Sequence, residues 1–277
     1  MISLEEVEEN VKGSGPVMKD AAIVLVHGMG KHEKGWSKNI QEVLKNGLPD
    51  FNIKPSFYET IYSDIVESPA FMAAFAKTKA EFTDTDMQVM LNYNKLEAAT
   101  DLAVTQVAPE EAAQPGFIDE GKAFLNTLFR YVAGYLGNAT LKAKIDKRIR
   151  VALAQAADQG GKGRVILIGH SLGSVISWSL ASEKNSPVWI TLSKLVTLGS
   201  PLGILEFIHV IQVKNVHSSW ANVVAPGDIA TTREVADPPF KSDQGLVLLR
   251  VRRVAKDPHS ALVDNPDVIK DWLPLSV

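Results

Sequence analysis

The sequence RVILIGHSLGSVISWSL, at residues 164–180, decides the fold class. The apolar run at 165–168 predicts a strand buried on both faces, as in parallel sheets. The pattern Gly-x-Ser-x-Gly follows at 169–173, and an apolar helix is predicted from Val175 to Leu180. A turn this tight lifts Ser171 clear of the sheet, with glycines giving the neighbouring backbone room and the helix N-terminus directed at the serine. Ser171 is therefore a candidate nucleophile, and a tight turn with an incidental serine is the alternative.

Apolar strands followed by glycine- or proline-containing loops recur along the chain. They are AAIVLVHG at 21–28, SKLVTLGSPLG at 193–203, WANVVAPGDIA at 220–230 and GLVLLRVRRV at 245–254, and the aromatic, β-branched PSFYETIYSDIV at 55–66 is a further predicted strand. Helix-length segments separate these strands. The alternation predicts an α/β fold, a mainly parallel sheet flanked by helices, in a single domain over residues 1–277.

Residues 67–130 interrupt this alternation. No strand is evident there, and the segment is rich in alanine and in apolar side chains. Apolar residues at helical spacing predict a helix that includes Phe117 to Val132 and another that includes Leu141 to Leu153. We interpret residues 67–130 as a helical insertion. Two interpretations of it stay open: extra helices that extend the core, or a lid over an active site.

Composition excludes several classes of protein. The chain has 277 residues, 45% of them hydrophobic and 22% charged, with a net charge of −3 and no cysteine. Nucleic acid is therefore not an expected partner, and thiol chemistry is excluded. No apolar stretch has the length of a membrane span or of a signal peptide core, so we expect a cytoplasmic protein without stable membrane insertion.

The motifs resemble those of the α/β-hydrolase superfamily, and within it the serine esterase and lipase-like branch. The stretches that carry the resemblance are LVHGMG at 25–30, GHSLGS at 169–174, LGSPLG at 198–203, NVVAPGDIA at 222–230 and DPHS at 257–260. They extend from about residue 20 to the C-terminus but leave out the insertion. The resemblance implies the α/β-hydrolase fold and a catalytic triad in the chain order nucleophile, acid, histidine, on loops after late strands.

His259 is the general base that this order implies, because it is the only one of six histidines beyond the last predicted strand. His209 and His217 are the remaining candidates for that role. His27 and His170 lie inside the two motifs, and we interpret them as structural.

Asp228 is the corresponding acid, since it closes the strand before the last one. Such an acid accepts a hydrogen bond from one imidazole nitrogen and stabilises the imidazolium. Three downstream acids are alternatives: Glu234, Asp237 and Asp243.

The resemblance also implies an oxyanion hole formed by two backbone N–H groups, those of Leu172, directly after the nucleophile, and of Met29, in the loop after the first motif strand. A serine nucleophile argues against the epoxide- and haloalkane-cleaving branches, which use aspartate at this position.

A nucleotide-binding loop is the competing interpretation of HGMGK at 27–31. A phosphate loop ending at Gly30-Lys31 requires glycine at position 25 and a hydroxyl at position 32. The chain has Leu25 and His32 instead, so both requirements fail. We predict no cofactor and no transition-metal site, because cysteine and His-x-x-x-His pairs are absent from the sequence. Calcium binding by carboxylates that the fold brings together stays open.

The sequence thus predicts a serine hydrolase that cleaves carboxylic esters, a carboxylesterase or lipase-like enzyme, through an acyl-enzyme. Its expected partner is a small ester with an apolar acyl or alcohol group. Thioesterase, lactonase and amidase activities use the same triad, and a non-catalytic binding module of this fold is the alternative from another class.

Overall fold

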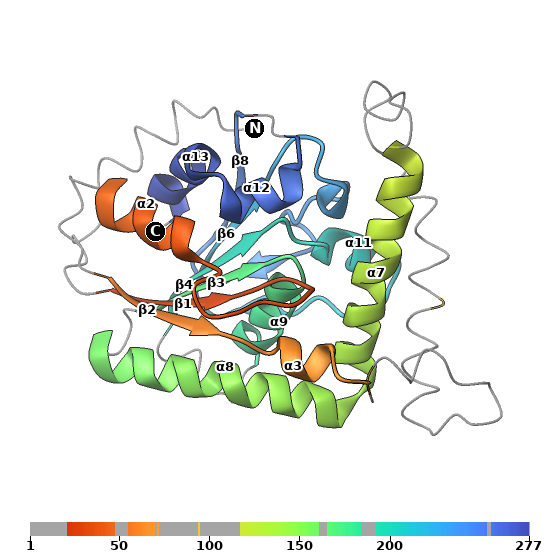
Figure 1. Cartoon of the computed structure of the whole chain (residues 1–277), viewed down its shortest axis with the longest axis horizontal. Helices are drawn as coiled ribbons and strands as arrows, with labels where there is room; N and C mark the ends of the chain where they lie inside the picture. The colour runs from red at the N-terminus through yellow and green to blue at the C-terminus, as the bar shows by residue number, and fades with distance from the viewer. Residues whose placement is uncertain are drawn as a thin grey trace.

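A six-stranded parallel sheet forms the centre of the molecule (Figure 1). The computed structural model describes residues 21–47, 55–69, 71, 94, 117–160, 165–183, 192–253 and 256–276. The strands lie in the order β2-β1-β3-β4-β6-β8, and each neighbouring pair is parallel. Their bounds are β1 Ala22–Val26, β2 Ser56–Thr60, β3 Val165–His170, β4 Leu192–Leu198, β6 Ser219–Val224 and β8 Leu246–Arg250. The predicted α/β class with a mainly parallel sheet is confirmed.

Helices cover both faces of this sheet (Figure 1). One face packs against α2 (Lys38–Gly47), α12 (Pro258–Asp264) and α13 (Pro266–Ser276). The other packs against α8 (Ala139–Gly160) and α9 (Leu172–Ala181), with α7 (Phe117–Gly137) standing across the carboxyl end of the strands. The smaller elements are α3 (Ser63–Val66), α11 (Leu202–Phe207), the 3₁₀ turn η2 (Ile229–Thr231), and the short parallel pair β5 (Asn215–Val216) and β7 (Lys241–Ser242).

Alternating side chains of β1 show how the apolar strands hold the layers together. Ala22, Val24 and Val26 lie in the core shared with α7, α8 and α9. Ile23 and Leu25 lie in the core shared with α2, α12 and α13. All five are at most 1% exposed. Burying a valine, leucine or isoleucine side chain stabilises a fold by roughly 1.5–3 kcal/mol, so a strand that is apolar on both faces favours this central position.

The strand predicted at 55–66 is too long. The observed strand, β2, ends at Thr60, and the last four residues of the predicted stretch form helix α3 (Ser63–Val66). Tyr62 turns the chain, because its backbone N–H donates to His27 Nε2 at 3.1 Å and its hydroxyl donates to the His27 carbonyl at 2.6 Å. Tyr62, an aromatic residue of a type common in strands, therefore hydrogen-bonds to the residue that follows β1 instead of extending β2.

The two long helices predicted around Phe117 to Val132 and Leu141 to Leu153 are present as α7 and α8. The insertion predicted at 67–130 can be described only in part: residues 70, 72–93 and 95–116 lie outside the described residues, whereas residues 117–130 form most of α7.

Candidate active site

Ser171 occupies a strained turn at the carboxyl end of β3. Its backbone angles are φ 54° and ψ −122°, and the residue is 1% exposed. A non-glycine residue at positive φ costs about 1–3 kcal/mol, so other contacts must hold it there. Its N–H donates to the Leu198 carbonyl of β4 at 2.9 Å, and its carbonyl accepts from the Ser174 N–H at 2.9 Å. The turn is thereby fixed to the neighbouring strand on one side and to α9 on the other.

The two glycines of the motif are required by close backbone packing. A Cβ on Gly169 would lie 2.4 Å from the Gly173 carbonyl oxygen. A Cβ on Gly173 would lie 2.3 Å from the His27 carbonyl oxygen. The N-terminus of α9 can therefore pack directly against the loop that follows β1.

That loop also reaches the candidate nucleophile. A Cβ on Gly28 would lie 3.0 Å from Ser171 Cβ, so the loop passes over the serine side chain. Met29 follows, half-buried, and its carbonyl contacts His32 Nε2 at 3.1 Å. Leu172, the first residue of α9, is buried, and N–H groups in a first helical turn have no partner within the helix. The residues predicted to form the oxyanion hole therefore lie on two segments that meet at Ser171.

His259 and Asp228 form a buried pair. His259 Nδ1 lies 2.9 Å from Asp228 Oδ1 and 3.0 Å from Oδ2. Since a carboxylate can only accept, Nδ1 carries the proton, which leaves Nε2 as the acceptor of a neutral imidazole. Asp228 Oδ1 also accepts from the Ala230 N–H at 2.9 Å.

The sequence predicted His259 in a loop, but the structure places it in the first turn of α12. Pro258 begins that helix, and Asp257 Oδ1 caps it by accepting from the Ser260 N–H at 3.1 Å. The capped first turn of α12 thus holds the backbone of His259 in a defined position.

Ser171, Asp228 and His259 converge around the end of β4. Gly199 directly follows Leu198, which binds the Ser171 N–H, and a Cβ on Gly199 would lie 2.9 Å from both Asp228 Oδ2 and His259 Nδ1. Ser171 Oγ and His259 Nε2 are both buried, and neither has a hydrogen-bond partner in the described part of the chain. No hydrogen bond joins these two atoms. Such bonds are often long in unliganded enzymes and shorten when substrate binds.

The contact between His170 and His259 was not predicted from the sequence. His170 Nε2 lies 3.0 Å from the His259 carbonyl oxygen, and the two ring centroids are 4.7 Å apart. Burial lowers the pKa of His170 well below its usual value, and the neighbouring His259 lowers it further. A neutral His170 therefore tethers the start of α12 to the end of β3. The partners are 89 positions apart in the sequence, so no local pattern would predict the contact.

His27 supports the loop over Ser171 in a similar way. Its Nε2 accepts from the Tyr62 N–H, so its Nδ1 carries the proton and donates to the Gly28 carbonyl at 2.6 Å. The Tyr62 ring stacks on the imidazole with centroids 4.0 Å apart. Burial lowers the pKa of His27 to about 3, although the Gly28 hydrogen bond opposes the shift. The structural role predicted for His27 agrees with these contacts.

The alternative base and acid candidates lie elsewhere. His209 is exposed just after α11, at φ 56°, and His217 Nδ1 bonds Asp243 Oδ2 on the surface at 2.9 Å. Glu234 pairs with Arg250. Asp237 contacts no histidine among the described residues. Of the predicted candidates, only Asp228 and His259 meet near Ser171.

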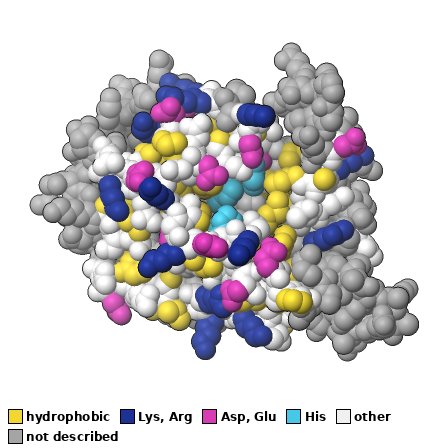
Figure 2. Space-filling model, viewed as in Figure 1, with side chains coloured by type: hydrophobic (Ala, Val, Ile, Leu, Met, Phe, Trp, Pro, Cys, Tyr) yellow, Lys and Arg dark blue, Asp and Glu magenta, His cyan; other side chains and the backbone are white. Residues whose placement is uncertain are grey.

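Helix α7 forms an apolar wall beside this pair. The Phe124 ring stands edge-on to the His259 imidazole, with centroids 4.9 Å apart and planes inclined at 70°. In Figure 2, histidine side chains are visible in a hollow, and hydrophobic side chains along α7 border it. The sequence predicted Phe124 on an apolar helix face, but it did not predict its contact with His259.

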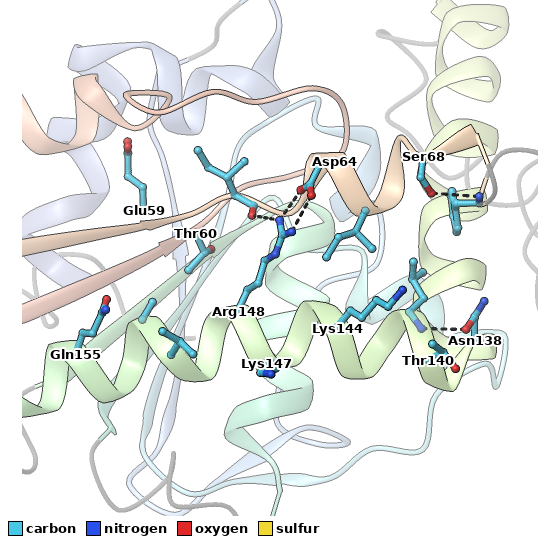
Figure 3. Close-up of a pocket in the computed structure, with 16 residues that line it drawn as sticks. Glu59, Thr60, Asp64, Ser68, Asn138, Thr140, Lys144, Lys147, Arg148 and Gln155 are labelled. Atoms are coloured by element: carbon cyan, nitrogen blue, oxygen red, sulfur yellow. Dashed lines mark hydrogen bonds and ion pairs between the residues drawn. The ribbon is translucent and has the colours of Figure 1, made fainter.

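A separate cavity of about 900 Å³ lies between α8, α3 and the edge strand β2 (Figure 3). Arg148 of α8 spans it and pairs with both oxygens of Asp64. Lys144 and Lys147 come from the same helix (Figure 3). None of Ser171, Asp228 and His259 lines this cavity, so we do not assign it to the candidate active site in spite of its size.

Metal-binding and membrane-spanning features were sought in the described ranges. No group of at least 3 histidine, cysteine, aspartate or glutamate side chains there is arranged to hold a metal ion. None of the helices described combines the length and apolarity needed to cross a bilayer. Comparison with protein-family models, with curated proteins and with solved structures found no match.

Proposed function

We propose that the protein is a serine hydrolase of carboxylic esters, with Ser171 as nucleophile, His259 as general base and Asp228 as the acid that orients it. One observation carries the proposal. The buried Asp228–His259 pair and the strained Ser171 turn meet at the end of β4, and each contributes a buried polar atom that has no hydrogen-bond partner among the described residues. Buried polar groups are normally hydrogen-bonded, and a catalytic role is one explanation for those that are not.

The proposed reaction has two steps. His259 Nε2 takes the Ser171 proton while Oγ bonds to the carbonyl carbon, and the imidazolium then protonates the alcohol oxygen as the carbon–oxygen bond breaks. A water molecule next gives its proton to Nε2 and attacks the acyl-enzyme, and the proton returns to Ser171. Asp228 stabilises the imidazolium in both steps.

The backbone N–H groups of Met29 and Leu172 are proposed to bind the oxyanion. The packing of Gly28 against Ser171 and the position of Leu172 at the start of α9 support this role. The α9 N-terminus adds a favourable partial positive charge. A donor of this kind contributes about 2.7–4 kcal/mol to transition-state stabilisation where a side-chain donor has been removed.

Labelling by a fluorophosphonate probe tests the proposal. We expect the wild-type protein to be labelled, Ser171→Ala to remain unlabelled, and Ser193→Ala, a substitution at the opposite end of the sheet, to be labelled like wild type. Circular dichroism and a melting curve establish that each variant is folded. A folded wild-type protein that is not labelled would exclude the hydrolase and favour a non-catalytic binding module.

Activity on p-nitrophenyl esters of graded acyl length separates the enzyme classes. Turnover of long acyl chains that rises at an oil–water interface supports a lipase, and a preference for short chains without such activation supports a carboxylesterase. Thioester, lactone and amide substrates test the other reactions open to the same residues.

A further inference from the structure

We propose that Phe124 binds the alcohol part of the ester, which makes it a specificity-determining residue for the leaving group. The inference rests on the proposed function. Its first support is the edge-on contact of the Phe124 ring with His259. Phe124 is only half-buried, so part of its ring is free to contact a substrate.

The surroundings of the imidazole define where Phe124 can act. Asp228 and Gly199 lie at the Nδ1 edge of the His259 imidazole. The His170 ring packs against the same imidazole, with the two ring centroids 4.7 Å apart. Phe124 therefore covers a side of the ring that these three residues leave open. The imidazole is thus surrounded by Asp228, Gly199, His170 and Phe124, and its Nε2 is buried without a hydrogen-bond partner among the described residues.

The chemistry of the first step identifies the substrate group next to Phe124. The atom that receives the proton from Nε2 is the alcohol oxygen of the ester, so that oxygen must come within hydrogen-bond reach of Nε2. Its substituent must then lie close to the imidazole, and Phe124 of α7 supplies an apolar ring in contact with that imidazole. The acyl chain is attached to the carbonyl carbon instead and points away from the proton donor. An apolar alcohol is the group that an aromatic ring at this place recognises.

Helix α7 holds Phe124 firmly. The next residue, Leu125, and Leu128 and Phe129 one turn further are fully buried in the core. The Phe71 ring packs against Gly134 of α7 so closely that a Cβ there would lie 1.9 Å from Phe71 Cε2. A wall fixed in this way discriminates between substrates, because it cannot adjust to a smaller group.

The test compares Phe124→Ala and Phe124→Leu with wild type on two ester series. One series keeps the acetyl group and varies the alcohol from methyl to hexyl and benzyl. The other keeps p-nitrophenol and varies the acyl chain. We expect kcat/KM of Phe124→Ala for hexyl and benzyl acetate to fall roughly tenfold relative to methyl acetate, as for loss of an apolar contact, with a smaller fall for Phe124→Leu. The relative acyl-chain profile is expected to stay that of wild type. Thr127→Ala, exposed on the same helix, is the matched control and is expected to behave as wild type.

Separating acylation from deacylation distinguishes substrate binding from a structural effect on His259. The alcohol has left before water attacks, so the deacylation rate constant, from burst kinetics with p-nitrophenyl acetate, should not change. If Phe124 only positions the imidazole, both steps slow together and the alcohol preference is unaltered. That result would overturn the inference while leaving the hydrolase proposal intact. A wild-type protein without esterase activity would overturn both.

Discussion

Asp228 uses both carboxylate oxygens on a single imidazole nitrogen, at 2.9 and 3.0 Å, inside a site where its own side chain is fully buried. In that position the carboxylate fixes the tautomer of His259, and in the proposed mechanism it stabilises the imidazolium. The pair His217–Asp243 lies on the surface, where His217 Nδ1 bonds one oxygen of Asp243, at 2.9 Å, and the Asp243 side chain is half exposed. The protein therefore has one buried and one solvent-exposed histidine–aspartate pair, and the exposed pair can serve as a control for mutations of the buried one.

Replacing Asp228 with asparagine is predicted to reduce kcat for ester hydrolysis by about 10³–10⁴-fold, because an amide can hold the imidazole in the wrong tautomer and does not stabilise its charged form. Asp243→Asn, at the surface pair, is predicted to keep wild-type activity. Steady-state kinetics on p-nitrophenyl acetate measures both. Wild-type rates for Asp228→Asn would remove Asp228 from the site.

At this scale the sequence predicted much of the site. Ser171, Asp228 and His259 follow from motif, order and loop position, and the structure brings the three together. The contacts of His170 and Phe124 with His259 could not be predicted, because each joins residues that are distant in the chain and belong to different elements. The spacing of residues in a sequence indicates which side chains share a face of one helix or strand. It does not indicate which side chains of different elements come into contact.

Among the elements, α9 shows most clearly how packing overrides local preference. Gly173 lies in the first turn of this helix, where alanine would be favoured over glycine by about 1 kcal/mol. A Cβ there would, however, lie 2.3 Å from the His27 carbonyl oxygen and 2.4 Å from that of Val26. Both contacts are with backbone at the end of β1 and the start of the following loop, and moving this backbone would also displace Met29, a proposed oxyanion donor.

Gly173→Ala is accordingly predicted to destabilise the fold by about 1–3 kcal/mol, the usual cost of overpacking, and to lower the rate of fluorophosphonate labelling. Urea denaturation measures the stability change. Gly245→Ala is the control: its φ of 95° makes alanine unfavourable, but no atom lies within 4 Å of the added Cβ, so stability should fall while labelling is unaffected. A more stable Gly173→Ala protein would show that helix propensity prevails over the clash.

The strands and long helices were predictable for a related reason. Continuous apolar runs and helical spacing carry enough signal when an element packs against the core along its whole length, on both faces for β1 and on one face for α8. The end of β2 was predicted wrongly because tyrosine is common in strands, and composition alone does not reveal the turn that the contacts of Tyr62 with His27 create.

For the whole molecule, the buried neutral histidines predict a dependence of stability on pH. Burial lowers the pKa of His27 from 6.5 to about 3, and that of His170 well below 6.5. Below pH 6.5 the unfolded chain binds protons at these residues and the folded protein does not, so acid favours unfolding. The free energy of unfolding is therefore expected to be highest above pH 6.5 and to fall as the pH drops toward 3, by up to about 1.4 kcal/mol per pH unit for each histidine.

His27→Asn is predicted to reduce this slope by about one proton between pH 6 and 4. Urea denaturation at a series of pH values gives the slope directly. Asparagine can still donate to the Gly28 carbonyl, but the variant has no imidazole to protonate. His209→Asn, at an exposed position with positive φ that asparagine tolerates, is the control for replacing a histidine outside the core. An unchanged slope in His27→Asn would mean that this imidazole titrates alike in the folded and unfolded chain.

The register of β1 has a consequence for how the chain is made. Ala22 pairs with Ser56 on one side and with Val165 on the other. During synthesis β1 can therefore meet its first neighbour early, but its second only after more than a hundred further residues have left the ribosome. Contacts this distant in sequence are slow to form. Because Ser171 follows directly on that second neighbour, the candidate site can assemble only late, after the long intervening segment has been synthesised.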